Sequence, residues 1–522
     1  MIVPLTPIRC LYRGVDLYGK KTGVVCGCRR FTYAEFGERV ERLAAGLAAA
    51  GIQPGDRVAY LSFNNAELLE GYFGVPLARA IAMPLNVRLT PFELTNILNH
   101  AEARILIFER DFAPLVEKLR GVCPKIERFI EIGADYEALL SGGRMARPDI
   151  FSFDENAICE LFYTSGSTGT PKGVMLSHRT LYLHALSVAL TLPQNDDAVE
   201  LHTIPLFHAN GWGRAHSSTL LGLRQVMVRR FEPPQVLRLI QAEKATGMAL
   251  VPTMANALLN CPELGAFDIS SMQAIMIGGA ASSPELIERM ERAFHCRVEA
   301  GYGLTESSPV ATCARRKSTV TYADEADRLR RLAMTGWPIT CCEVRVVDPH
   351  MRDVPRDMQS IGEVVIRGDN VMDGYYREPE TTASVISDGW LHTGDMAVWD
   401  EEDYIHIVDR QKDIIISGGE NISSIEVERA IFAHPAVLEC AVVSSPDAQW
   451  GEVPAAFVVL KPGQQLSEAQ LGEFLQGRIA RFKMPRHVEF CEEALPKTGT
   501  GKIVKRQLRE QFWSGMEKRV QG

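Results

Sequence analysis

The chain has 522 residues, more than a single domain normally holds. Its composition, with 46% hydrophobic and 23% charged residues, is ordinary for a globular protein, and a net charge of -9 argues against general nucleic-acid binding. The N-terminus lacks the apolar core of a signal peptide and no apolar run is long enough to cross a membrane, so we expect a cytoplasmic protein without a transmembrane segment.

Helix-like and strand-like patterns alternate through the first half of the chain. A helical period at residues 33–50 precedes a strand at 58–62, and further strands are predicted at 103–108, 157–163, 201–205, 225–228, 274–277 and 297–300. Helices are expected after Ser177, which can serve as an N-cap, and from Ser282 onward. This alternation predicts an α/β fold, with a large N-terminal domain of parallel-rich sheets covered by helices.

The pattern changes to short strands after residue 335. Strands at 343–347, 363–367 and 404–408 predict a β-rich subdomain at 335–406, inside an N-terminal domain that we place at 1–409. A helix at 425–433, strands at 438–443 and 455–460, and a helix at 468–480 then predict a small α+β domain at 410–522. Because ligands of parallel sheets bind at the carboxyl ends of strands, motifs that follow strands are the candidate sites.

A segment rich in glycine and hydroxyl groups follows the strand predicted at 157–163. It reads Thr164-Ser165-Gly166-Ser167-Thr168-Gly169-Thr170-Pro171-Lys172-Gly173. Glycines let backbone N–H groups approach a ligand closely, and the hydroxyls and the lysine add donors, so this composition is typical of phosphate binding. A flexible polar loop would have a similar composition. The proline before the lysine breaks the spacing of a Walker A loop, which excludes the ordinary P-loop kinases and ATPases.

Four further motifs occur along the chain. In order, they are Pro205-Leu206-Phe207-His208-Ala209-Asn210-Gly211-Trp212, Gly301-Tyr302-Gly303-Leu304-Thr305-Glu306, Gly389-Trp390-Leu391-His392-Thr393-Gly394-Asp395 and Pro496-Lys497-Thr498-Gly499-Thr500-Gly501-Lys502-Ile503. With the glycine loop they closely resemble the adenylate-forming superfamily, which includes acyl-CoA synthetases, peptide-synthetase adenylation domains and luciferases. The resemblance covers nearly the whole chain, in the family's order. It implies ATP-dependent activation of a carboxylic acid through an acyl-AMP, chemistry that needs cations and N–H donors around a charge-rich transition state.

The resemblance also implies a role for each motif. The loop residues Thr164, Ser165, Gly166, Ser167, Thr168, Gly169 and Lys172 should hold the β- and γ-phosphates of ATP. Thr164 and Glu306 match positions associated with Mg²⁺, an ion that prefers oxygen ligands. Adenine should lie between Tyr302 and the stretch Gly279, Ala280 and Ala281, with Gly301, Gly303 and Thr305 beside it. Asp395 and Arg410 should bind the ribose hydroxyls.

Three features of the C-terminal part complete the implied site. Lys502 matches the lysine that bridges the substrate carboxylate and the α-phosphate. Lys412 matches the hinge about which the small domain rotates, and Gly418, Gly419 and Glu420 resemble the loop that meets CoA. Each residue type also admits an ordinary structural role, as a helix cap, a core ring, a surface ion pair or a solvated lysine.

The motif around His208 and Trp212 resembles fatty acyl-CoA synthetases, in which the tryptophan gates the acyl tunnel and the histidine lines it. We therefore expect the acid to meet His208, Asn210, Gly211, Trp212 and Gly303, and His208 to join Lys172, Lys412 and Lys502 as catalytic residues. The small neighbours of Trp212 favour linear acids of short to medium length with uncharged tails.

Three classes of function remain compatible with the sequence. The first is an acyl-CoA synthetase for a medium-chain fatty acid or a similar acid. The second is an acyl-AMP ligase of the same fold, which stops at acyl-AMP or passes it to a carrier protein, and an aryl-CoA ligase is a further alternative. The third is a nucleotide-binding regulatory protein, against which intact Lys172, Glu306 and Lys502 argue. ATP, CoA and a small carboxylic acid are the expected ligands, and the oligomeric state stays open with a homodimer as the commonest default.

Overall fold

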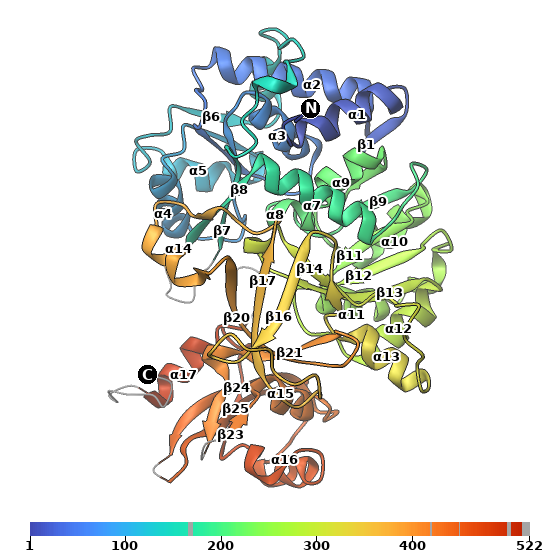
Figure 1. Cartoon of the computed structure of the whole chain (residues 1–522), viewed down its shortest axis with the longest axis vertical. Coiled ribbons are helices and arrows are strands. Elements are labelled where there is room, and N and C mark those ends of the chain that lie inside the picture. Colours follow the sequence, from blue (N-terminus) through green and yellow to red (C-terminus); the bar gives the residue numbers. More distant parts are fainter. Residues whose placement is uncertain (165–170, 418–419, 448, 498–502, 514–522) are drawn as a thin grey trace. The chain divides into compact units, whose positions relative to one another are not determined.

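A computed structural model of the chain describes residues 1–164, 171–417, 420–447, 449–497 and 503–513. By its internal packing the chain divides into two compact units, whose elements are labelled in Figure 1. The first unit comprises Met1–Val344, Ile366–His392 and Glu402–Ile405, and the second comprises Arg345–Val365, Thr393–Glu401 and His406–Gly522. No helix in the described ranges is both long and apolar enough to cross a membrane.

The first unit contains a nine-stranded sheet in the order β15-β14-β13-β12-β11-β9-β10-β1-β2. The strands from β13 to β1 run parallel, and β2, β14 and β15 are antiparallel to their neighbours. The bounds are β1 Thr22–Cys26, β2 Arg29–Thr32, β9 Val199–His202, β10 Arg224–Met227, β11 Gly247–Leu250, β12 Ala274–Ile277, β13 Arg297–Gly303, β14 Val310–Cys313 and β15 Trp337–Pro338. The predicted parallel-rich sheet is therefore confirmed.

A second sheet of this unit has seven strands in the order β18-β8-β7-β4-β3-β5-β6. Its bounds are β3 Arg57–Leu61, β4 Ile81–Pro84, β5 Ile105–Phe108, β6 Arg128–Glu131, β7 Ile158–Thr164, β8 Lys172–Ser177 and β18 Gly374–Tyr375. Strands β7, β4, β3, β5 and β6 are parallel, whereas β8 and β18 are antiparallel additions at one edge. Strand β8 is not among the strands predicted from the sequence pattern.

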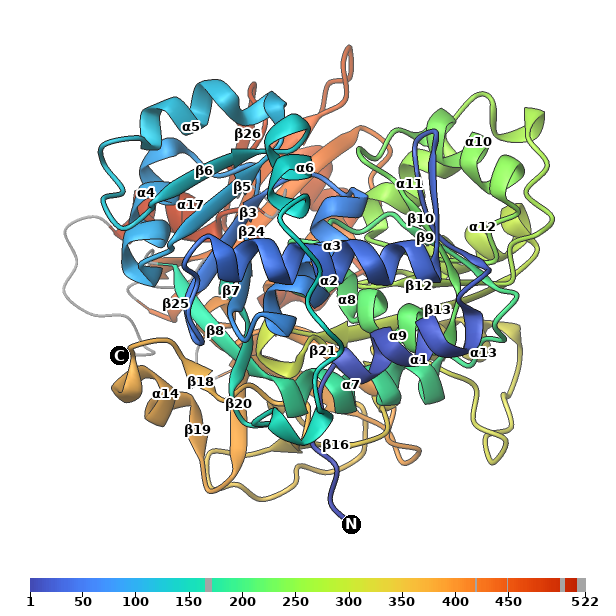
Figure 2. The same cartoon turned by 90° about the horizontal axis from the view of Figure 1, so that it is seen from above.

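Helices cover these sheets, as expected for an α/β fold. Their bounds are α1 Ile8–Tyr18, α2 Tyr33–Ala49, α3 Ala66–Leu77, α4 Pro91–Ala101, α5 Ala113–Leu119, α6 Ala134–Leu140, α7 His178–Thr191, α8 Ala209–Trp212, α9 Arg214–Leu221, α10 Pro233–Glu243, α11 Pro252–Leu259, α12 Pro284–Phe294, α13 Glu325–Ala333 and α14 Pro379–Val385. Helices α4 and α5 pack on the seven-stranded sheet, and α10 to α13 pack on the nine-stranded sheet. Helices α1 and α9 lie side by side in Figure 2.

The short strands predicted for residues 335–406 are confirmed. They are β16 Cys342–Val347, β17 Gly362–Gly368, β19 Ile386–Ser387, β20 Trp390–Trp399 and β21 Ile405–Arg410, which belong to one five-stranded sheet. The division between the two units runs through β16, β17, β20 and β21.

The second unit also holds the predicted C-terminal α+β elements. A five-stranded sheet is formed by β22 Ile415–Ser417, β23 Glu420–Ile422, β24 Val437–Asp447, β25 Gly451–Leu460 and β26 His487–Cys491. Its helices are α15 Ser424–Phe432, α16 Glu468–Leu475 and α17 Lys505–Trp513. Helix α16 ends earlier than the pattern predicts, because Gln476 is extended and Gly477 has a φ of 74°.

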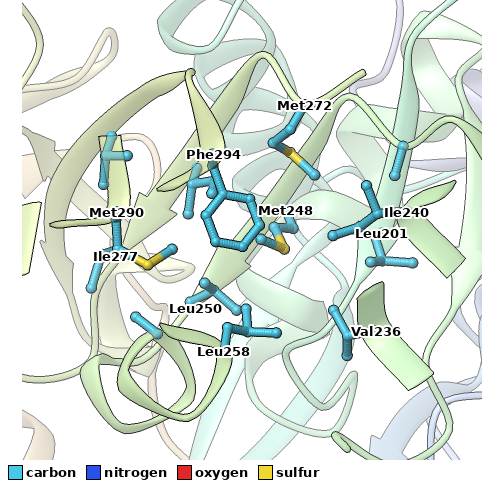
Figure 3. Packing of buried hydrophobic residues seen from close by; sticks show 14 of the residues in the cluster. Leu201, Val236, Ile240, Met248, Leu250, Leu258, Met272, Ile277, Met290 and Phe294 are labelled. Atoms are coloured by element: carbon cyan, nitrogen blue, oxygen red, sulfur yellow. The ribbon is translucent and has the colours of Figure 1, made fainter. Parts of the chain in front are cut away.

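The core beneath the nine-stranded sheet centres on Phe294, whose ring faces neighbouring methionine and aliphatic side chains in Figure 3. Phe294 is 1% exposed, and its cluster includes Met248, Met272 and Met290. These contacts fix α12 against the sheet, and with it the position of the chain that leaves β12.

We predict that Phe294→Ala lowers the free energy of unfolding by about 3–5 kcal/mol, because it removes a buried ring and leaves a cavity. Urea unfolding followed by circular dichroism measures the loss. Phe151→Ala is the matched control, since Phe151 is 54% exposed, and it should change stability by less than about 0.5 kcal/mol. Equal effects of the two substitutions would contradict the assigned core.

Candidate active site

The glycine loop connects β7 to β8, and the pairing of these strands holds its two ends together. In the antiparallel register Thr164 lies opposite Lys172. At the far end of β8, Ser177 accepts a hydrogen bond from the Thr180 backbone at 3.3 Å, which confirms the predicted N-cap of α7. The predicted phosphate-binding residues between the strands lie outside the described residues; they are Ser165, Gly166, Ser167, Thr168 and Gly169.

Lys172 and Glu306 approach the same side chain, Tyr375, which belongs to none of the five motifs. Tyr375 lies on β18, next to β8 in the sheet. Its hydroxyl donates to Glu306 Oε1 at 2.8 Å, and Lys172 Nζ lies 5.0 Å from the centre of its ring. A cation at this distance is attracted to an aromatic face. The structure thus places the predicted phosphate-binding lysine and the predicted metal ligand around one tyrosine.

The motif Gly301-Tyr302-Gly303 forms the end of β13 instead of following it. Its strand lies beside β12, so the motif and the segment from Gly279 to Ala281 leave adjacent strands at the same edge of the sheet. A methyl group at Gly303 would lie 1.7 Å from the Pro309 carbonyl oxygen, so only glycine fits there. Gly279, Ala280 and Ala281 are exposed and Tyr302 is half-buried, so a flat ligand can reach both surfaces.

Residues 209–212, labelled α8, form a turn of left-handed conformation that carries Trp212. The φ angles of Ala209, Asn210, Gly211 and Trp212 are 41°, 45°, 63° and 62°. For residues with a side chain this conformation costs roughly 1–2 kcal/mol each, so the turn needs support from its surroundings. Gly213 closes it with a φ of 77°.

The support comes from Glu160, a buried carboxyl group on β7. Asn210 Nδ2 donates to Glu160 Oε2 at 3.0 Å, and His216 Nε2 lies 3.2 Å from Glu160 Oε1. Neither His216 Nε2 nor Glu160 Oε1 has a hydrogen-bond partner elsewhere in the described residues. Burial raises the pKa of Glu160 to about 8, and burial lowers the pKa of His216 to about 3. A protonated Glu160 facing a neutral His216 therefore satisfies both atoms.

The side chain of Trp212 projects from this turn onto the ends of β12 and β13. A methyl group added at Gly278 would come within 3.3 Å of the indole and within 3.0 Å of the Gly301 carbonyl oxygen. His208, at the start of the turn, is half-buried with its ring centre 4.7 Å from that of Phe207. Trp212 therefore borders the strand ends that carry the nucleotide motif. Asn210 and Gly211 are buried within the turn itself.

A narrow cavity of about 40 Å³ extends from Trp212 along the nine-stranded sheet. Every second residue along β11, β12 and β13 faces the cavity, and these residues form rows that run across the three strands. Gly278 and Gly301 lie under Trp212. Beyond them, the first row is Ala249, Met276 and Glu299, and the next is Gly247, Ala274 and Arg297. Val188, Leu192 and Ile339 contribute apolar surface to the facing wall.

In the second unit, Asp395 and Arg410 form an ion pair. Arg410 Nε donates to Asp395 Oδ1 at 2.7 Å, and the side chain of Asp395 is 5% exposed while that of Arg410 is 50% exposed. Lys412 lies in the turn Gln411–Asp413 directly after Arg410, and its pKa is lowered by burial. The Lys412 carbonyl oxygen accepts a hydrogen bond from Arg509 at 2.8 Å, which ties this turn to α17.

The other residues predicted in this unit are the bridging lysine and the segment that meets CoA. Lys502, Gly418 and Gly419 lie outside the described residues, and of Glu420 only the backbone, at the start of β23, is described. Among the described residues, no three His, Cys, Asp or Glu side chains are grouped to hold a metal ion.

Comparisons with known proteins agree with this geometry. The family described as AMP-binding enzyme matches residues 11–376, and its C-terminal domain matches residues 426–502. The chain is 40% identical to a long-chain-fatty-acid–CoA ligase of Thermus thermophilus, over 96% of this chain and 94% of the relative. It is 39% identical to a feruloyl-CoA synthase of Amycolatopsis sp, over 94% and 96%. The crystal structure of the anthranilate CoA ligase AuaEII in complex with anthranoyl-AMP matches with a TM-score of 0.87 and 28% identity, covering 98% of each chain.

The chain therefore belongs to the AMP-binding enzymes of the adenylate-forming superfamily. Within that superfamily it is an AMP-forming acid–thiol ligase, which converts an acyl or aryl acid to its CoA thioester through an acyl-AMP.

The protonation of Glu160 predicts a pH dependence of stability. Because burial raises its pKa to about 8 in the folded state, the stabilisation is fully present below the ordinary pKa of about 4.5 and is lost as pH rises through 8. Glu160→Gln keeps the hydrogen bonds of the neutral acid and removes its titration. Urea unfolding of both proteins at pH 5 and pH 9 should show that the variant loses less stability over this range; an equal loss would contradict a protonated Glu160.

Proposed function

We propose that this ligase activates a monocarboxylic acid of medium length with an uncharged tail. The observation that carries the proposal is the cavity beyond Trp212. Successive same-face residues on a strand are about 7 Å apart, so the rows from Gly301 to Arg297 span about 13 Å. This length suits a medium-chain acyl group, and most of the wall is apolar. Because the free volume is only about 40 Å³, Trp212 has to swing aside to admit such a chain. Apolar surface favours the transfer of methylene groups from water.

An aryl acid is the second candidate. Gly247, Ala249 and Ala274 give the sheet side of the cavity small side chains, against which a planar ring can lie. The relatives support both candidates, since one is named for a long-chain fatty acid and another for a feruloyl group.

We assign the chemical roles as follows. The substrate carboxylate attacks the α-phosphate of ATP, pyrophosphate leaves, and the thiol of CoA then attacks the acyl carbon and releases AMP. In the first step Lys172 and the loop from Thr164 to Gly169 neutralise the departing phosphates, and Lys502 contacts the carboxylate and the α-phosphate.

Tyr302 stacks on adenine, and Asp395 with Arg410 binds the ribose. His208 and Trp212 border the acyl group. The segment Gly418, Gly419 and Glu420 meets CoA after rotation about Lys412.

The oxygens of Thr164 and Glu306 fit Mg²⁺, which prefers one or two protein oxygens together with phosphates and water. Tyr375 donates to Glu306 Oε1, so this carboxylate is oriented by a neighbour while it remains half-buried. Bound Mg²⁺ would supply positive charge to the phosphates.

The substrate proposal is tested by kcat/KM for a homologous series of acids, measured as CoA-dependent AMP formation. In the unsubstituted protein (the parent), each methylene added to the acid should raise kcat/KM by about fourfold, the equivalent of roughly 0.8 kcal/mol, until the acid reaches the end of the cavity. Longer acids should then lose activity through strain. Trp212→Ala should move the optimum to longer or bulkier acids. A flat parent profile, or one that the substitution leaves unchanged, would overturn the role of Trp212; a preference for benzoate-like acids would favour the aryl candidate.

The role of Lys502 is tested by separating the half-reactions. Lys502→Ala should slow acyl-AMP formation at least 100-fold, in line with the roughly 2.7–4 kcal/mol measured for loss of one preorganised transition-state donor. Thioester formation from supplied acyl-AMP should be largely retained. Lys497→Ala, five positions earlier and ion-paired to Glu439, is the matched control and should leave both rates near the parent values. An equal loss of both half-reactions would refute the assignment.

A further inference from the structure

Among the described residues that line the cavity, Glu299 carries the carboxyl group, and the other charged side chains are Arg214, Arg297 and Arg315. Glu299 lies in the row with Ala249 and Met276, on the face of β13 opposite Val298, which is buried in the core. It therefore points away from the core of the sheet and lines the cavity.

The carboxyl group of Glu299 has almost no partner of its own. Within the described residues its only hydrogen-bond contact is the thiol of Cys313, whose Sγ lies 3.9 Å from Oε2, and no cation comes within 4 Å. Thiols are weak donors. Burial raises the pKa of Glu299, although Arg297 and Arg315 act to lower it. A half-buried carboxyl group without a good donor is costly to the fold, and a ligand that supplies one would remove the cost.

The surrounding charges restrict what that donor can be. Arg297 and Arg315 line the same cavity and act on Glu299, so a cationic group on the ligand would meet two like charges. An anionic group would meet the carboxyl group of Glu299 itself. A neutral hydroxyl group avoids both repulsions and donates the hydrogen bond that Glu299 lacks.

We propose that Glu299 is a specificity-determining residue, which accepts a hydrogen bond from a hydroxyl group on the distal part of the acid. This inference rests on the proposed function, because it assumes that the acyl or aryl group occupies the cavity beyond Trp212. It narrows the substrate class to hydroxylated acids of medium length. Glu299 lies about 7 Å from the row of Gly301, about halfway along the roughly 13 Å that the rows span. The hydroxyl group therefore belongs about 7 Å beyond that row, at the end of a shorter acid or in the middle of one that fills the cavity.

The experiment compares pairs of acids that differ by one hydroxyl group. The probes are a para-hydroxycinnamic acid against cinnamic acid, and an ω-hydroxy fatty acid against the methyl-terminated acid of equal length. For each pair, kcat/KM is measured as CoA-dependent AMP formation. In at least one pair the parent should prefer the hydroxylated acid by about tenfold or more, the range of a hydrogen bond to a charged group.

Substitutions identify the residue responsible. Glu299→Leu should bring the preference to about one or reverse it, while activity toward the acid without the hydroxyl is retained or increases. Glu299→Gln keeps an acceptor and should keep part of the preference. Glu288→Gln is the matched control, because Glu288 is on α12 and pairs with Arg292, and it should leave the ratio unchanged. The ratio within a pair cancels changes in folded fraction.

The outcomes separate this inference from the proposed function. If no acid supports CoA-dependent AMP formation, the proposed function itself fails. If acids are activated but the parent shows no preference in either pair, or if Glu299→Leu retains the parent ratio, the role of Glu299 is overturned. If Glu299→Leu does not fold, Glu299→Gln provides the test. A preference for the hydroxylated acid equal to that of the parent, together with an unchanged KM for that acid, would then overturn the role of Glu299.

Discussion

The hydrogen bond from Asn210 to Glu160 joins the two halves of the active site. Glu160 lies on β7, the strand that ends at Thr164 in the phosphate loop, and Asn210 lies in the turn that carries Trp212. One strand therefore positions both the glycine loop and the turn that carries Trp212. The bond is buried, so water cannot replace it, and losing it would leave a polar group unsatisfied inside the protein. The left-handed turn depends on this support, because it is unfavourable by itself.

Much of the architecture follows from local pattern. Alternating helical and strand periods predict parallel sheets, and parallel strands bring their carboxyl ends to one edge, so glycine motifs after strands meet there. The apolar run of β12 predicts that strand, and a hydroxyl residue directly before a helical period predicts the N-cap Ser177. The pattern does not predict strand β8, because its residues directly follow Pro171 and a glycine loop whose composition is typical of a turn.

Glu160, Tyr375 and Glu299 are not predicted as site residues, because tertiary contacts decide their roles. Glu160 lies in an apolar run whose pattern predicts only a buried strand, because its partners Asn210 and His216 are distant in sequence. Tyr375 contacts Glu306 only because β18 adds to the edge of β8, a long-range pairing without a local period. Glu299 carries no motif, and its importance depends on which face of β13 it occupies. Contacts set by tertiary pairing and by turn handedness leave little trace in single-sequence periodicity.

Under the proposed function, the row arrangement of the cavity has a consequence for how acid preference can change during evolution. Each row takes one side chain from each of three strands, and neighbouring rows are about 7 Å apart along the sheet. A larger residue at Gly247 or Ala274 would shorten the pocket by a whole row, whereas a substitution at Ala249 would close it nearer to Trp212. Divergence among related ligases would then proceed in jumps between substrate size classes, and a single codon change would suffice for each jump.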